Sequence, residues 1–287
     1  MYSFRLERRY LFTGQLALDT ALHIGGGHAS LSPSVSPIVR TPEGTPFIPG
    51  SSFKGVFRST VEKIGGSIPV VRTCALIDGS DCLTVSSPEQ RAEFDKRRRD
   101  EGWNDAKLMD ELHAALCDTC HLFGSPYAAS HMLFSDLHAI SADDALTQIR
   151  DGVGIDRDRE CAVPRIKYDF EVLEHNVNFD VRLILENPSD RDLQLACVGL
   201  AEFMTGFVTL GGKRSRGLGR CVLNNLVVHE LDLSDPRTGV DRLRAYLRGT
   251  PERPEDNMTR NPDARDFLDV TIQRRGQGGE DGRRRHF

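Results

Sequence analysis

The chain has 287 residues, of which 39% are hydrophobic and 28% are charged, and its formal net charge is −5. These values are typical of a globular protein with one large or two small domains, and they exclude nucleic-acid binding through an overall positive charge. No apolar run approaches the roughly 18 residues that a membrane span requires, and the start of the sequence lacks a signal-peptide pattern, so we expect a cytoplasmic protein without membrane contact.

The first part of the chain predicts a strand, a long loop and a helix. Apolar residues alternate with polar or small ones from about 11 to 24, which is the period of a strand, and a run of three glycines ends it. A loop rich in Ser and Pro follows. Ser51 or Ser52 can then cap a helix that runs to about Ile64.

Residues 70–125 differ from their surroundings in composition. They contain a charged, helix-prone stretch that is flanked by cysteine pairs, so we expect an inserted subdomain. Within it, the basic run Lys96–Arg99 favours the solvated face of a helix over a nucleic-acid contact.

The remaining part of the chain predicts further strands around one long helix. Residues 131–140 predict a short strand, and residues 151–174 predict two extended arms around a polar turn. A strand at 179–186 precedes a helix whose apolar residues step by three and four, with Cys197 in the core stripe. Residues 221–231 predict the last strand.

This order of elements predicts an α+β sandwich of ferredoxin-like type with inserts. We expect its core in residues 1–69 and 126–250, with residues 70–125 as the inserted subdomain. The polar composition of residues 251–287 predicts a largely disordered tail.

A basic loop, GGKRSRGLGR at 211–220, joins the long helix to the last strand. Its charges are those of Lys213, Arg214, Arg216 and Arg220. Glycine lets the backbone approach a ligand closely, and the cations attract anions such as phosphate. A solvated turn is the alternative that this stretch alone leaves open.

Four cysteines border the inserted subdomain, in the spacings C-x7-C and C-x2-C. They are Cys74, Cys82, Cys117 and Cys120. The second spacing lets two thiolates meet one tetrahedral Zn²⁺, and an odd total of seven cysteines disfavours a closed disulfide framework. We therefore expect a structural Zn²⁺ there, with His113 or His121 as a substitute ligand. A redox pair would require a strand–CxxC–helix context that the sequence does not predict.

Several motifs occur in the order that is seen in RAMP proteins. They are LHIGGG (22–27), TPFIPGSSFKGVFRS (45–59), CHLFGS (120–125), GIDRD (154–158) and LGGKRSRGLGR (210–220). Over residues 8–231 the chain resembles the repeating backbone subunits of type III CRISPR effector complexes. The resemblance implies a ferredoxin-like (RRM-like) core with a thumb hairpin. It also implies a CRISPR RNA guide along a filament of RAMP subunits, with a complementary target RNA.

The resemblance further implies roles for individual residues. Lys54 and Arg58 match a basic helix that contacts guide phosphates, and residues 151–174 match the thumb, which in relatives wedges between nucleotides. The glycine-rich loop that lines the same RNA is matched by Gly211, Gly212, Lys213, Arg214 and Arg216. The four cysteines lie where relatives carry a zinc-binding insertion. Such a surface holds an RNA backbone without reading its bases, as a guide of arbitrary sequence requires.

One departure from the family bears on catalysis. Relatives that cut the target carry an aspartate in the loop before the IVR-like stretch, whereas residues 34–36 are Ser-Val-Ser here, and no acid lies between Asp19 and Glu43. We therefore expect the subunit to hold the target RNA without cutting it. A carboxylate from elsewhere, Glu43 or Asp156, is the alternative.

Two other functions stay open at this point. The first is a metal-dependent endoribonuclease that cuts the target, or a guide-processing ribonuclease that uses His23 or His28 as a general base. The second is a stand-alone, zinc-stabilised module for single-stranded RNA, which would bind RNA as a monomer without guide-dependent assembly.

Overall fold

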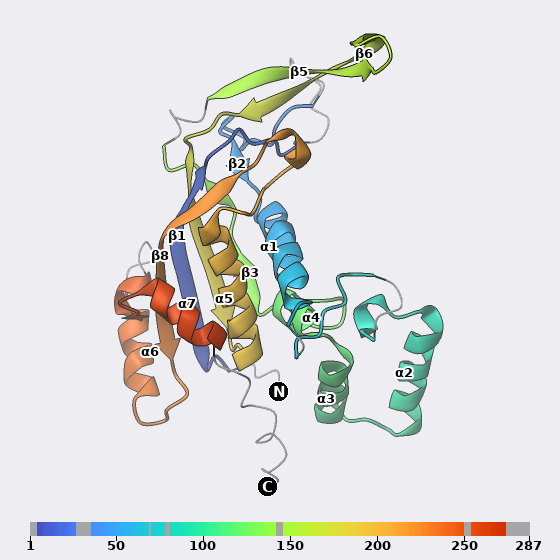
Figure 1. Cartoon of the computed structure of the whole chain (residues 1–287). Coiled ribbons are helices and arrows are strands. Elements are labelled where there is room, and N and C mark those ends of the chain that lie inside the picture. Colours follow the sequence, from blue (N-terminus) through green and yellow to red (C-terminus); the bar gives the residue numbers. More distant parts are fainter. Residues whose placement is uncertain are drawn as a thin grey trace.

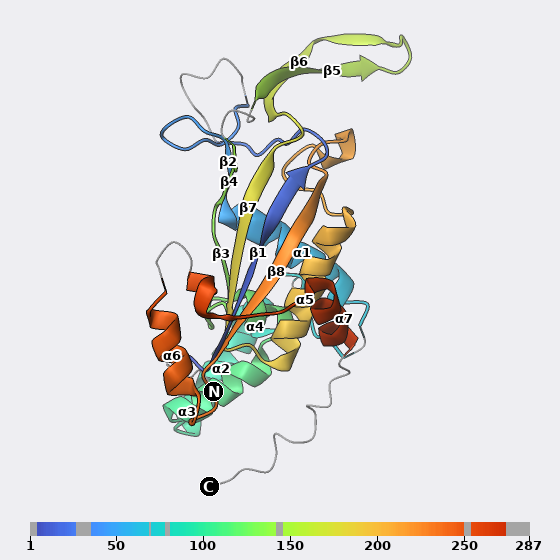
Figure 2. The same cartoon turned by 90° about the vertical axis from the view of Figure 1, so that its left-hand side faces the viewer.

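A computed structural model describes residues 5–26, 36–68, 70–77, 81–141, 146–249 and 254–273. Its centre is a five-stranded antiparallel sheet with the order β3-β7-β1-β8-β9 (Figures 1 and 2). The strands are β3 (Met132–Phe134), β7 (Asn178–Glu186), β1 (Arg8–Leu18), β8 (Cys221–Asp232) and β9 (Thr259–Arg260). The chain is therefore a mixed α/β protein.

Two long helices, α1 (Gly50–Gly65) and α5 (Asp190–Thr205), cover one face of this sheet and pack against each other. Because successive strand residues point to opposite faces, Phe12 and Leu16 of β1 face these helices and join the main core. Leu11 faces the other side and packs with Tyr246 of α6 (Gly239–Leu247). Figure 2 shows α5 and α6 on opposite sides of the sheet.

The predicted helix at 51–64 is confirmed as α1, but the predicted serine cap is wrong. The N-cap residue is Pro49, and no side chain caps the helix. The amide of Gly50 instead donates to Oδ1 of Asp136, at 2.7 Å. The predicted strand at 131–140 is interrupted at Asp136 and forms two strands, β3 and the short β4 (Leu137–His138). The second of these pairs with β2 (Phe47–Ile48).

Residues 70–125, here called the helical insertion, contain α2 (Pro88–Asp100), α3 (Asp105–Ala115), α4 (Asp118–Phe123) and the short η1 (Leu83–Val85). A small separate core holds them together, and it includes Leu83, Val85 and Leu116. None of the α2 residues is buried, so the basic run Lys96–Arg99 lies on a solvated helix face, as predicted.

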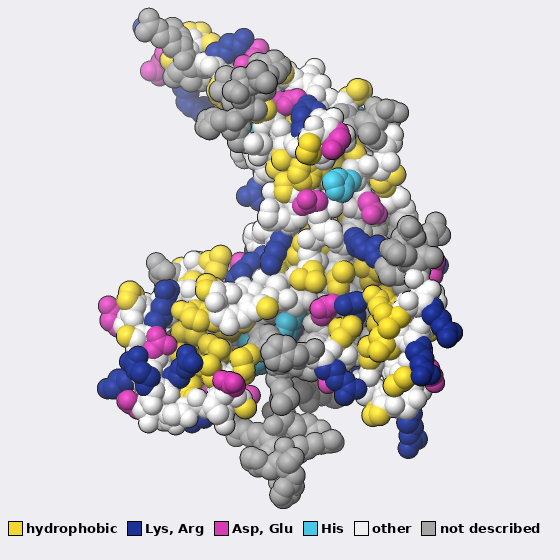
Figure 3. Space-filling model, turned by 180° about the vertical axis from the view of Figure 1, so that it is seen from behind, with side chains coloured by type: hydrophobic (Ala, Val, Ile, Leu, Met, Phe, Trp, Pro, Cys, Tyr) yellow, Lys and Arg dark blue, Asp and Glu magenta, His cyan; other side chains and the backbone are white. Residues whose placement is uncertain are grey.

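A long hairpin of β5 (Thr147–Asp156) and β6 (Cys161–Leu173) forms a two-stranded antiparallel sheet of its own. The two extended arms predicted from 151 onwards are thus present and begin at Thr147. The hairpin projects beyond one end of the central sheet, and the helical insertion lies toward the other end (Figure 1). Seen from behind, the surface is hollowed between them, and Lys and Arg side chains lie along the hollow (Figure 3).

The C-terminal region departs from the disorder that its polar composition predicts. Residues 254–273 contain the short η3 (Pro254–Asn257) and α7 (Ala264–Gln273). Leu268 of α7 is buried in the main core, and Nε2 of Gln194 on α5 donates to the carbonyl oxygen of Ile272 at 2.8 Å. The expected tail from 251 is therefore wrong for this segment, while 250–253 and 274–287 lie outside the described residues. No helix in the described ranges is long and apolar enough to cross a membrane.

Candidate functional site

The four predicted cysteines come together at the base of the helical insertion. Their Sγ atoms all lie within 4.8 Å of one another, and all four side chains are buried, free thiols. The Sγ atoms of Cys74 and Cys120 are 3.6 Å apart. A tetrahedral ion with metal–sulfur distances of about 2.3 Å separates its ligands by about 3.8 Å. The cluster can therefore hold a metal ion.

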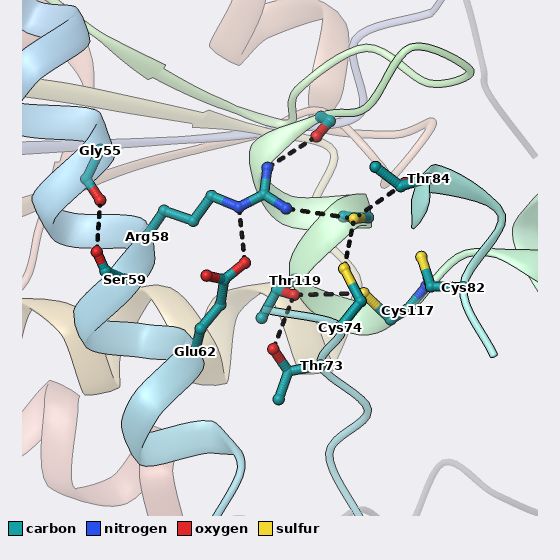
Figure 4. Close-up of polar contacts among 12 residues, drawn as sticks. Gly55, Arg58, Ser59, Glu62, Thr73, Cys74, Cys82, Thr84, Cys117 and Thr119 are labelled. Atoms are coloured by element: carbon teal, nitrogen blue, oxygen red, sulfur yellow. Dashed lines mark hydrogen bonds and ion pairs between the residues drawn. The ribbon is translucent and has the colours of Figure 1, made fainter. Parts of the chain in front are cut away.

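Hydrogen-bond donors surround these sulfurs (Figure 4). Oγ1 of Thr84 donates to Sγ of Cys120 at 3.2 Å, and the amide of Cys117 donates to Sγ of Cys82 at 3.4 Å. Hydrogen bonds with Cys117 and Cys120 lower the pKa of Cys82 far below its ordinary value, while burial raises the pKa of Cys74 to about 11. A cation bound at these sulfurs would compete with their protons.

The substitute ligands His113 and His121 are engaged with each other instead. Nε2 of His121 lies 2.9 Å from the carbonyl oxygen of His113, and the two ring centres are 3.9 Å apart. Within the described ranges, the group of side chains that could hold a metal ion consists of the four cysteines.

The basic loop lies against the long hairpin. Lys213 has a φ of +57°, and its Nζ lies 4.4 Å from the ring centre of Phe170 on β6. The guanidinium carbon of Arg216, in the short η2 (Arg214–Arg216), is 5.5 Å from the ring centre of Tyr168, and Nη1 of Arg216 donates to the hydroxyl of that tyrosine. Two cation–aromatic pairs thus join the loop to β6.

Two glycines of this loop are required by close backbone packing. Gly211 has a φ of +74°, and a Cβ there would lie 2.3 Å from the carbonyl oxygen of His23. Gly219 has a φ of +82°, and a Cβ there would lie 1.9 Å from the carbonyl oxygen of Leu210. The amide of Gly212 donates to the same His23 oxygen at 2.8 Å. These glycines set the shape that presents the loop's cations.

Lys54 and Arg58, predicted to act beside this loop, lie on α1. Nζ of Lys54 is 3.4 Å from Oγ of Ser130, and burial together with the charge of Arg58 lowers the pKa of Lys54. The Arg58 side chain points to the cysteine cluster, where Nη2 donates to Sγ of Cys120 at 3.3 Å. The structure thus joins Lys213 and Arg216 to the hairpin, and Arg58 to the cysteines.

The catalytic alternatives find limited support in the geometry. His23 is buried, and its Nδ1 lies 2.7 Å from the carbonyl oxygen of Glu171, as in a structural histidine. Oδ1 of Asp156 accepts the amides of Asp158 and Arg159 and so shapes the hairpin turn. Glu43 is fully exposed, and a hydrogen bond with Thr41 lowers its pKa. His28 and residues 34 and 35 lie outside the described residues.

Three residues that contact the cations of these sites were not singled out by the sequence. Tyr168 and Phe170 stand two apart on one strand, so they share a face, and this spacing is the signal that could have identified them. Glu62, which holds Arg58 in place, stands four residues after it on α1, at the spacing of a helical ion pair.

Comparison with known proteins adds a family assignment. A family model described as the RAMP superfamily matches residues 15–222. The chain is 25% identical over 231 residues to "CRISPR system Cms endoribonuclease Csm3" of Streptococcus thermophilus, which covers 75% of this chain and 87% of that protein. A protein of the same name from Methanothermobacter thermautotrophicus is 43% identical over 61 residues, or 20% of this chain and 25% of that protein.

Proposed function

Because the chain belongs to the RAMP superfamily, we propose that it is a guide-binding backbone subunit of a type III CRISPR effector complex. The family match over residues 15–222 carries this proposal, because it includes the cysteine cluster, the long hairpin and the whole basic loop. It also confirms the resemblance to RAMP proteins that the motifs indicated. The partners would be a CRISPR RNA, a complementary target RNA and further RAMP subunits, in a cytoplasmic ribonucleoprotein.

The strand order supports a ferredoxin-like core. In that fold, each helix connects two strands that have an antiparallel strand between them. Here α1 lies between β1 and β3 in the chain, and β7 separates these strands in the sheet. Likewise α5 connects β7 to β8, and β1 separates them. We propose that these four strands and two helices are the core, and that the helical insertion and the long hairpin are additions to it.

The RNA surface that we propose consists of the basic loop, the long hairpin as a thumb, and Lys54 on α1. Arg214 and Arg216 are exposed, and Lys213 is half-buried over Phe170, so the loop offers charge to phosphates. The hairpin carries exposed apolar side chains on β5, such as Val153 and Ile155, which could pack against bases. Such contacts bind RNA of any sequence.

We also propose that the cysteine cluster holds one structural Zn²⁺. Four thiolates that can reach one ion are a donor set that favours zinc, and burial protects them from solvent. Cys74, Cys82, Cys117 and Cys120 would be the ligands. When bound, the ion would supply folding free energy to the helical insertion, whose own apolar core is small.

The subunit would hold the target RNA without cutting it, because residues 34–36 carry no acid where cutting relatives have an aspartate. The second candidate is a target-cutting endoribonuclease, and the name of both Csm3 relatives favours it. The two candidate functions use the same RNA surface, and they differ only in whether the subunit cuts the target RNA.

One experiment separates these candidates. The complex is assembled with its guide and supplied with end-labelled complementary RNA and Mg²⁺, and the products are resolved by length. An intact target supports the holding function. Regularly spaced cuts that disappear in the Glu43→Gln or Asp156→Asn variant would support the endoribonuclease, and failure to recover guide RNA with the purified complex would contradict both.

A further inference from the structure

The guanidinium of Arg58 is held by three acceptors (Figure 4). Nε donates to Oε1 of Glu62, one turn later on α1, at 2.7 Å. Nη1 donates to the carbonyl oxygen of Gly124, directly after α4, at 3.2 Å, and Nη2 donates to Sγ of Cys120 at 3.3 Å. The Arg58 side chain is 15% exposed and that of Glu62 is 9% exposed. Each guanidinium nitrogen therefore has an acceptor inside the protein.

This geometry suits a buried group of thiolates. Four thiolates around a divalent cation leave two negative charges uncompensated, and burying charge without a partner costs free energy. Arginine keeps its positive charge at any physiological pH, and Arg58 lies in hydrogen-bond contact with one of the four sulfurs. Thr84 donates a second hydrogen bond to the same sulfur, so Cys120 accepts from two side chains outside the cluster.

Arg58 also connects two parts of the fold. It belongs to α1, which packs on the central sheet, whereas Cys120 and Gly124 belong to α4 and the residue after it in the helical insertion. Glu62 accepts from Nε and so fixes the orientation of the planar guanidinium of Arg58. The two terminal nitrogens of that guanidinium then reach the Gly124 carbonyl oxygen and the Cys120 sulfur together. A lysine at this position could keep the charge but could not serve three acceptors in fixed directions.

We propose that Arg58 is a positioning residue of the metal centre. It orients Cys120, offsets part of the charge of the metal-bound thiolates and fastens the insertion to α1. This inference rests on the proposed zinc site, and it assigns Arg58 to that site in place of the guide phosphates that the family resemblance implied. Lys54 is then the residue of α1 that we expect to contact RNA.

The test measures zinc affinity in the full-length protein by competition with a coloured chelator of known affinity. Arg58→Met removes both the positive charge and the guanidinium donors, whereas Arg58→Lys keeps the charge and removes the guanidinium. Lys63→Met is the matched control, because it removes one exposed positive charge from the same helix. Loss of a residue that supports a metal ligand weakens binding about 10–100-fold, and we expect that for Arg58→Met, a smaller loss for Arg58→Lys and none for Lys63→Met.

Two further readouts separate this role from a general effect on folding. With Co²⁺ in place of Zn²⁺, the absorption bands of the thiolate-bound ion should shift in Arg58→Met and stay unchanged in Lys63→Met. At saturating Zn²⁺, Arg58→Met should bind guide RNA with the affinity of the wild type. If Arg58→Met does not fold, the zinc affinity of Arg58→Lys tests the inference instead, and a reduced affinity supports it.

The outcomes are distinct. Wild-type zinc affinity in both Arg58 variants would overturn the inference and leave the zinc site intact. Reduced RNA affinity together with wild-type zinc affinity would also overturn it and return Arg58 to the RNA surface. A wild-type protein that binds no zinc would contradict the proposed metal centre itself, and a protein that binds zinc but no guide would contradict the RNA function alone.

Discussion

The ammonium group of Lys213 lies 4.4 Å from the centre of the Phe170 ring, so a cation of the basic loop rests on an aromatic residue of the long hairpin. Phe170 is itself buried with Ala21, Val172 and Leu218. The loop and the base of the hairpin are therefore packed as one unit, and a change in either should affect the other.

Replacing Phe170 with Leu should loosen the basic loop. The substitution keeps an apolar side chain in the cluster but removes the aromatic ring below Lys213, and a cation–π contact of this kind contributes about 1 kcal/mol, or about a fivefold change in an opening equilibrium. Hydrogen exchange of the amides at 213–217 should become faster by about that factor. Phe170→Tyr, which keeps an aromatic ring below Lys213, is the matched control, and equal exchange in both variants would contradict the prediction.

Neutralising the loop should weaken RNA binding for every sequence alike. In the triple variant Lys213→Ala, Arg214→Ala and Arg216→Ala, the slope of log affinity against log salt should fall by about 2, at about 0.7 per lost phosphate contact with single-stranded RNA. Fluorescence anisotropy across a salt series measures this slope. The control removes three exposed cations of α2, namely Lys96, Arg98 and Arg99, and should leave the slope unchanged. Unchanged affinity in the loop variant would remove the loop from the RNA surface.

Removing one cysteine ligand should abolish zinc binding. Elemental analysis of freshly purified Cys120→Ser should find little zinc, whereas Cys161→Ser, which changes an exposed cysteine of the hairpin, should retain the wild-type content. Zinc should also be lost as the pH falls, because protons compete for the thiolates and burial raises the pKa of Cys74 to about 11. Wild-type protein that retains no zinc at neutral pH would refute the site.

Asp192 should stabilise the fold in a pH-dependent way. Its carboxylate, 2% exposed, accepts from the amide and hydroxyl of Ser189 in a capping box at the start of α5, and Nδ1 of His131 lies 3.1 Å away. Burial alone would raise the pKa of Asp192, but the hydrogen bonds with His131 and Ser189 outweigh it, so the net pKa is lowered. Asp192→Asn should cost about 1.5–3 kcal/mol at pH 7.

The sign of the pH effect follows from this lowered pKa. A carboxyl group whose pKa is lower in the folded state stabilises the fold above its unfolded pKa, about 3.9, and loses that contribution as the pH falls through its folded pKa. Urea unfolding should therefore show the difference between wild type and Asp192→Asn shrinking below about pH 4. Asp190→Asn, at an exposed position of the same helix turn, should show little difference at any pH. A constant difference for Asp192→Asn would contradict the assignment.

Introducing an acid into the Ser-Val-Ser segment should create target cutting. If the absent carboxylate is the reason for an intact target, one of the single variants Ser34→Asp, Val35→Asp or Ser36→Asp should raise the cutting rate, by about 10²–10⁴-fold if it acts as a general acid–base group. Labelled target RNA in the assembled complex measures this. Asparagine at the same position is the control, and three inactive aspartate variants would indicate that more than one group is absent.

Periodicity predicted the elements that carry one buried face. The alternation from about 11 to 24 predicted β1, although that strand ends at Leu18. The steps of three and four predicted α1 and α5, because each of these helices packs one side against the main core. The cysteine cluster was also predictable, since a C-x2-C pair brings two thiolates to one ion whatever the surrounding fold is. That a metal ion binds there, and that this ion is zinc, both stay predictions.

Other features depend on contacts between distant segments. Arg58 stands on the same helix as Lys54, and the local sequence does not indicate that it faces Cys120, 62 positions later. α7 was missed because its apolar residues, such as Phe267 and Leu268, lie within a polar stretch, and their burial depends on packing against α5. The serine cap failed because Asp136, from a distant segment, provides the acceptor for the first amide of α1.

The positions of the four cysteines also affect how the protein could be modified. Cys74 and Cys82 stand where the chain leaves the core, and Cys117 and Cys120 stand where it returns. Residues 83–116 therefore begin and end at the cysteine cluster. The entropy of closing a loop grows only slowly with its length. The exposed turn between α2 and α3, around Gly102, should accordingly accept a fluorescent tag or a small folded domain, which would allow individual subunits to be counted within an assembled complex.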